Sequence, residues 1–112
     1  MGFRATSQVT DGVAKITLAG ELDAAAAPAF KAEVEKAIAE HPRRVALLLE
    51  QLEYVASAGL RVLIFAKQKL GADVDIFIVG AQPAVAETLK LTGFNYSVVM
   101  LDQYDAAQIE AV

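Results

Sequence analysis

The sequence predicts an α/β domain spanning residues 1–112, in which helices cross between the strands of a mostly parallel sheet. Three observations predict this fold class. Segments with strand patterns alternate with segments of helical period along the whole chain. The inner strand-like segments are continuously apolar, as in strands buried on both faces of a sheet. The first two strand-like segments are separated only by a short turn, which indicates an N-terminal antiparallel hairpin.

The hairpin is predicted from Arg4–Val9 and Val13–Ala19, which flank Thr10-Asp11-Gly12. Asp-Gly is a strong signal for a tight hairpin turn. Apolar residues of the second strand alternate with polar ones, and these apolar residues are Ala14, Ile16 and Leu18. This alternation is the period of a strand with one face in water.

The first helix is predicted around Pro28, because proline suits the first turn of a helix. An apolar stripe at positions i, i+4 and i+8 follows, formed by Phe30, Val34 and Ile38. The helix is expected to end at His41-Pro42.

The remaining elements continue the alternation. Val45–Leu49 and Val74–Val79 are predicted as neighbouring buried strands, and Gly59–Leu70 as an apolar helix that packs against the sheet. The last part of the chain is expected to contain a helix at Pro83–Leu91, a strand at Tyr96–Leu101 and a short helix at Asp105–Val112.

Composition disfavours several function classes. Ten Lys and Arg against fourteen Asp and Glu give a formal net charge of −4, which is unsuited to a nucleic-acid partner. The chain has no cysteine, which excludes disulfides and thiolate metal sites. No apolar stretch approaches the roughly 20 residues of a membrane-spanning helix, so we expect no membrane insertion and a cytoplasmic protein.

No catalytic or metal-binding constellation is visible, so we expect no enzyme activity, metal or cofactor. His41 is the only histidine and is interpreted as a solvent-exposed residue at a helix end. Asp73 and Asp75 are expected to point outward at the start of a strand, and Asp102 and Asp105 to belong to a terminal turn. Phosphate-binding and zinc-binding motifs are absent from the sequence.

The segment around Ser57 joins an extended stretch to an apolar helix. Ser57 is interpreted as the helix N-cap, because its hydroxyl can bond a free backbone N–H. A phosphate at this position would also be tolerated, since the free N–H groups and the helix dipole favour an anion. The two interpretations are compatible, because a capping hydroxyl can also accept a phosphate.

Three segments resemble motifs of the STAS domain, the family of bacterial anti-sigma-factor antagonists. They occur in the family's order and spacing, and they are Gly20-Glu21-Leu22-Asp23, Val55-Ala56-Ser57-Ala58-Gly59-Leu60 and Leu89-Lys90-Leu91-Thr92-Gly93-Phe94. The resemblance implies a STAS-like fold, a mostly parallel sheet with an N-terminal hairpin and helices packed against it.

The resemblance also implies a function and a site. The implied function is partner switching, in which the protein binds an anti-sigma-factor serine kinase until Ser57 is phosphorylated. The implied partner-binding residues surround Ser57 in the two motifs, and they are Asp23, Glu21, Ala56, Ala58 and Gly59. A substitution such as Asp23→Ala or Gly59→Arg is expected to weaken partner binding and leave the fold intact.

Two departures from the family pattern keep an alternative open. Ala56 stands where the family usually has aspartate, and Ala58 where it has serine or threonine. Both favour a docking module without phosphorylation, for example in a lipid-transport ATPase or a stress-signalling assembly. A third reading, a small enzyme or nucleotide-binding domain with an anion site at Ser57, lacks a catalytic base and a glycine-rich loop.

Overall fold

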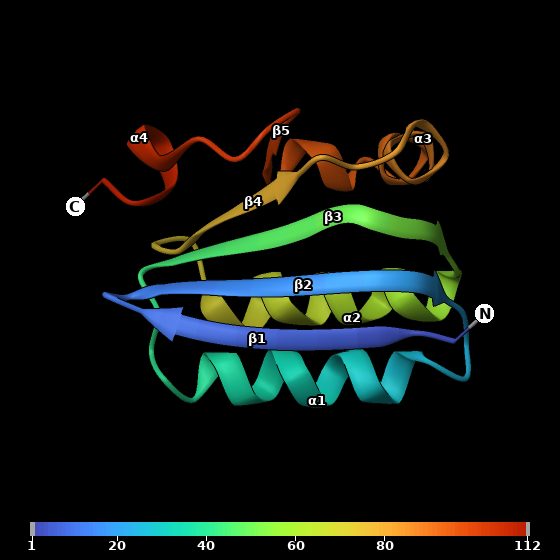
Figure 1. Cartoon of the computed structure of the whole chain (residues 1–112), viewed down its shortest axis with the longest axis horizontal. Helices are drawn as coiled ribbons and strands as arrows, with labels where there is room; N and C mark the ends of the chain where they lie inside the picture. Colours follow the sequence, from blue (N-terminus) through green and yellow to red (C-terminus); the bar gives the residue numbers. More distant parts are fainter. Residues whose placement is uncertain (1, 112) are drawn as a thin grey trace.

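The computed structural model describes residues 2–111, and its five strands form one sheet in the order β1-β2-β3-β4-β5 (Figure 1). The predicted α/β architecture, a mostly parallel sheet with an N-terminal hairpin and helices packed against it, is confirmed. The elements are β1 (Arg4–Thr10), β2 (Val13–Leu22), α1 (Ala27–Ile38), β3 (Arg44–Val55), α2 (Ser57–Leu70), β4 (Asp75–Val79), α3 (Pro83–Leu91), a 3₁₀ turn (Phe94–Tyr96), β5 (Val99–Leu101) and α4 (Ala106–Ile109). Residues 1 and 112 of the predicted span lie outside the described part.

The N-terminal hairpin is confirmed. β1 pairs antiparallel with β2, whereas the β2–β3, β3–β4 and β4–β5 pairs are parallel. Both turn residues have positive φ, 54° at Asp11 and 81° at Gly12. That backbone matches the twist of two-residue hairpins, which explains why Asp-Gly connects the strands.

The core lies on both faces of β3, as the continuous apolar run predicts. On one face Val45, Leu47 and Leu49 pack with residues of α1 and α2 in the larger buried cluster. On the other face Ala46 packs with Phe77 of β4 and with Ile109, the buried anchor of α4. Figure 1 shows α1 and α2 together on one side of the sheet and α4 away from them.

Polar contacts connect the C-terminal segment with β2. The Tyr104 hydroxyl donates to Glu110 at 2.6 Å, and Lys15 of β2 lies 3.6 Å from the same carboxylate. The Lys15 ammonium also lies 4.8 Å from the centre of the Tyr104 ring. Burial and the bond to Glu110 raise the pKa of Tyr104 above its ordinary value.

The C-terminal elements are shorter than predicted. The strand expected at Tyr96–Leu101 is wrong in its first half, because Phe94–Tyr96 forms a 3₁₀ turn and β5 begins at Val99. Gly93, with φ of 77°, directs the chain into this turn. The helix expected at Asp105–Val112 covers Ala106–Ile109, with the Asp105 carboxylate accepting from the backbone N–H of Gln108.

Candidate functional site

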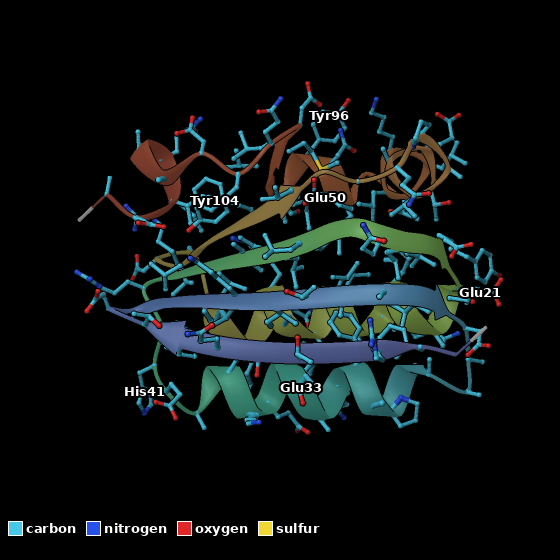
Figure 2. All side chains as sticks on the ribbon, viewed as in Figure 1. Glu21, Glu33, His41, Glu50, Tyr96 and Tyr104 are labelled. Carbon is cyan, nitrogen blue, oxygen red and sulfur yellow. The ribbon has the colours of Figure 1, made fainter. Side chains whose placement is uncertain are left out.

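The carboxyl ends of β2 and β3 lie side by side at one edge of the sheet. Leu22 pairs with Val55, and the backbone N–H of Ala56 donates to the Leu22 carbonyl at 2.8 Å. Asp23 and Ser57 directly follow these two strands. The fold therefore brings together the two motifs that the sequence keeps more than thirty residues apart. Figure 2 labels Glu21 at this end of the sheet.

Asp23 shapes the turn that leads from β2 to α1. Its side-chain Oδ1 accepts from the Ala26 backbone N–H at 2.9 Å, and its carbonyl accepts from Ala26 and Ala27, each at 3.1 Å. The carboxylate bonds its own turn, as Asp side chains commonly do. Asp23 nevertheless remains exposed to solvent.

Ser57 lies at the first position of α2 and is exposed. The prediction that Ser57 is the N-cap is wrong. Ala56 occupies that position with extended backbone, φ −83° and ψ 167°, and it makes no side-chain cap. The reason is that β3 pairs with β2 as far as Val55, which leaves one residue between strand and helix. The Ser57 hydroxyl consequently does not occupy the capping position.

The predicted partner residues differ in their exposure. Glu21 is exposed, and Ala56 and Ala58 are half-buried. Gly59 is buried, and a Cβ atom there would lie 2.6 Å from Cγ of Leu22. The expectation that an arginine at 59 leaves the fold intact is therefore wrong. Gly59 allows α2 to approach β2, and it offers no side chain to a partner.

Two irregularities in β3 expose residues that sequence analysis did not select. The pairing steps from Thr17↔Leu48 to Ala19↔Gln51 and from Gly20↔Leu52 to Glu21↔Tyr54, so β3 carries an extra residue at each step. Such bulges redirect side chains. As a result Tyr54 is 50% exposed and pairs with exposed Glu21. The signal was the spacing of three between the buried residues Leu49, Leu52 and Val55.

The edge around Asp23 and Ser57 presents polar side chains and one aromatic side chain. Within residues 2–111, no group of three or more His, Asp or Glu side chains could hold a metal ion. His41 is exposed at the opposite end of the molecule (Figure 2), and Asp73 and Asp75 are exposed before and at the start of β4. No described helix is long and apolar enough to cross a bilayer. What the edge offers is a hydroxyl, carboxylates and an exposed tyrosine.

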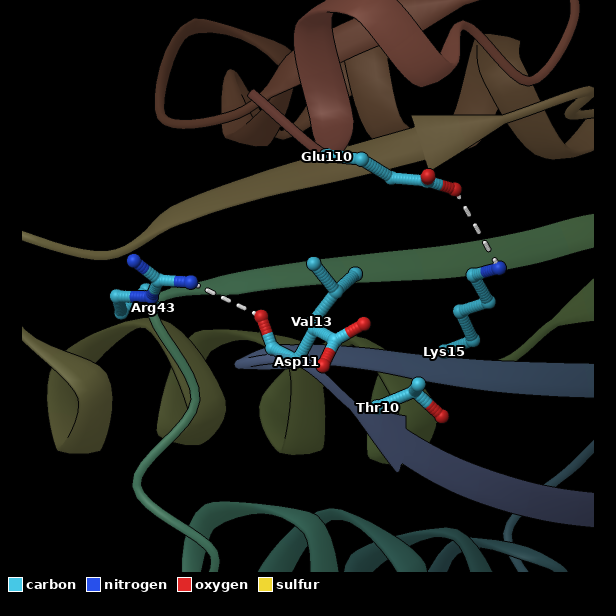
Figure 3. Close-up of a pocket in the computed structure, with 6 residues that line it drawn as sticks. All are labelled: Thr10, Asp11, Val13, Lys15, Arg43 and Glu110. Carbon is cyan, nitrogen blue, oxygen red and sulfur yellow. Dashed lines mark hydrogen bonds and ion pairs between the residues drawn. The ribbon is translucent and has the colours of Figure 1, made fainter. Parts of the chain in front are cut away.

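A separate hollow of about 320 Å³ lies at the hairpin turn (Figure 3). Its polar groups are partly engaged with one another. Arg43 donates to the Asp11 carbonyl at 2.9 Å, and Lys15 pairs with Glu110. Because these residues stand where β2 and β3 begin, the hollow is at the other end of the strands from Ser57.

Comparison with known proteins gives a consistent result. The sequence profile of the STAS domain family matches residues 4–107. The chain is 34% identical to a Bordetella bronchiseptica protein described provisionally as anti-sigma factor antagonist BtrV, over 82% of this chain and 80% of that protein. It is 26% identical to the anti-sigma-F factor antagonist RsfB of Mycobacterium tuberculosis, over 76% and 70% of the two chains.

A solved structure agrees. The crystal structure of an anti-sigma factor antagonist from Mycobacterium paratuberculosis superposes with a TM-score of 0.86. The match covers 96% of this chain and 92% of that one at 26% sequence identity.

Proposed function

Because this chain belongs to the STAS domain family, we propose that it is an anti-sigma factor antagonist that acts as a single domain in a partner-switching system. Its partner is an anti-sigma-factor serine kinase, which it binds while Ser57 is unmodified and leaves when Ser57 carries a phosphate. In this proposal the chain performs no catalysis and binds no cofactor. Because the partner consumes ATP, the exchange takes place in the cytoplasm.

One observation carries the proposal. The chain presents Ser57 exposed at the start of α2, beside the exposed Asp23 turn, in the part of the sequence that matches the family. The names of BtrV and RsfB support the antagonist role. Loops and helix starts held on a rigid sheet are common places for partner contacts.

The switching step is a phosphoryl transfer catalysed by the kinase. The Ser57 Oγ attacks the γ-phosphorus of ATP, the new Oγ–P bond forms, and the bond from that phosphorus to the bridging oxygen breaks to release ADP. The hydroxyl proton passes to a base of the kinase. The phosphate adds about −1.5 to −2 charges at neutral pH. A partner surface matched to a neutral hydroxyl would then face an unpaired anion, which favours release.

Ser57→Asp should weaken kinase binding at least about tenfold relative to Ser57→Ala, because the carboxylate brings negative charge to the contact. The measurement is calorimetric titration with an anti-sigma-factor kinase, to be sought among the genes adjacent to this one. With ATP, wild type should gain one phosphate by intact mass and Ser57→Ala none. The matched control is Ser97→Asp, at an exposed serine outside this edge, which should bind like wild type.

Two outcomes refute the switch. One is wild type that takes no phosphate, and the other is Ser57→Asp that binds as well as Ser57→Ala. The chain would then be a STAS docking module without phosphorylation, a second candidate that Ala56 and Ala58 favour because neither brings the family's polar side chain to Ser57.

Asp23→Ala should weaken partner binding several-fold and lower the free energy of unfolding by about 0.5–1.5 kcal/mol. The binding loss follows from the missing carboxylate, and the stability loss from the missing bond to the Ala26 N–H. Asp73→Ala, an exposed acid at the other end of the sheet, removes the same charge and should leave binding unchanged. Equal affinities for the two variants would move the interface away from the Asp23 turn.

A further inference from the structure

The outer face of α2 carries a row of exposed residues that begins at Ser57. They follow one another at helical spacing, and they are Ser57, Arg61, Ile64 and Gln68. Arg61 is the only charged residue in the segment 57–64, the first two turns of the helix. Within residues 2–111 the Arg61 side chain takes part in no hydrogen bond and no ion pair. No polar contact among the described residues therefore engages this guanidinium.

The spacing brings Arg61 within reach of a group attached to Ser57. Side chains four residues apart on a helix are neighbours, with Cβ atoms about 5–6 Å apart. An acid that precedes a base by four residues is the favourable orientation. The first turn of α2 contains no acidic residue, and Ala56 provides no side-chain cap. A phosphate at Ser57 would thus be the first negative charge on this turn and would meet an unpaired guanidinium.

Acidic residues in the neighbouring segments disfavour a further negative charge, and a cation near Ser57 would offset this effect. Exposed acidic residues stand in the neighbouring segments, Glu21 in β2, Asp23 directly after β2 and Glu53 near the end of β3. The negative charges of these carboxylates would oppose a dianionic phosphate on Ser57. Arg61 can offset them, since a guanidinium presents two parallel N–H donors to a phosphate.

We propose that Arg61 is the intramolecular partner of the phosphate on Ser57. The inference rests on the proposed function, because it concerns the phosphorylated state. In the unmodified chain the guanidinium is free to meet a partner. In the phosphorylated chain it is held by the phosphate, so that one modification both adds negative charge and withdraws a positive group from the contact surface.

The test is a phosphorus-31 NMR titration of the full chain with genetically encoded phosphoserine at position 57, which needs neither kinase nor partner. The second pKa of phosphoserine is about 6. Arg61 favours the dianion, so we expect this pKa to be lower in wild type than in Arg61→Gln by about 0.15–0.4 unit. Lys69→Gln removes the same charge from an exposed site in the last turn of α2 and should shift the pKa less.

Arg61→Lys keeps the charge without the paired donors and should give an intermediate pKa. Equal pKa values in wild type and Arg61→Gln would overturn the proposal, and so would an equal shift in Lys69→Gln. Binding of the phosphorylated chain to the kinase separates this inference from the function. If the pKa difference is present but the phosphate leaves kinase affinity unchanged, the Arg61 pairing stands and the partner switch falls.

Discussion

Leu63→Ala should lower the free energy of unfolding by about 2–5 kcal/mol, as expected when a buried leucine leaves a cavity in a packed core. Leu63 is 2% exposed and belongs to the larger buried cluster. It lines the interface between α1, α2 and the sheet together with Phe30, Val34 and Leu47. The void at this interface is only about 10 Å³, so the side chains around Leu63 are closely packed. Removing most of the Leu63 side chain therefore creates a new cavity.

Urea denaturation followed by circular dichroism measures this loss. The matched control is Ile64→Ala, at the next position of the same helix, where the side chain is 42% exposed. Folding removes less apolar surface from water at Ile64 than at Leu63. Ile64→Ala should therefore lower the free energy of unfolding by much less than Leu63→Ala. If the two variants unfold at the same urea concentration, the inward face of α2 is assigned incorrectly.

Gly59→Arg should lower the free energy of unfolding by more than about 3 kcal/mol, because it overpacks a tight contact and brings a charge into it. Leu22, whose side chain the new Cβ would meet, is 0% exposed and surrounded by core residues. Neither the helix nor Leu22 can move away without disturbing the β2–β3 end of the sheet.

The same denaturation experiment can resolve the cause. Gly59→Ala adds only the Cβ atom and should lower the free energy of unfolding by about 1–3 kcal/mol. Gln68→Arg places the larger side chain on the exposed face of α2 and should change stability by less than about 0.5 kcal/mol. A Gly59→Arg protein as stable as wild type would contradict the close approach of α2 to β2.

Turn residues and apolar runs in the sequence predicted two kinds of element correctly. These are the tight hairpin turn and the strand that is buried on both faces of the sheet. Asp11-Gly12 specified the hairpin turn, and the run Val45–Leu49 identified a strand that is covered on both faces. The limits of Tyr96–Leu101 were less predictable. Its apolar and aromatic residues favour a strand locally, but Gly93 and the short pairing with β4 leave only Val99–Leu101 in the sheet.

The candidate site was located by its motifs, whereas only part of its geometry was predictable from the sequence. Its two halves come from adjacent parallel strands, and the bond from Ala56 to Leu22 depends on a pairing that no local pattern specifies. The burial of Gly59 also requires knowledge of what packs against the helix. The exposure of Tyr54 follows from the extra residues in β3, and bulges carry little sequence signal beyond an altered spacing of apolar residues.

β3 is longer than β4, so its two halves should differ in the free energy needed to open them locally. β4 accompanies β3 only from Arg44 to Leu48, and beyond that point the Gln82 side-chain amide donates to the Glu50 carbonyl at 2.9 Å. The last part of β3 therefore has strand pairing on the β2 side alone. Segments with fewer ladder bonds and more exposed backbone open at lower free energy than the centre of a sheet. The end that carries Ser57 is consequently expected to open at lower free energy than the part of β3 that is shared with β4.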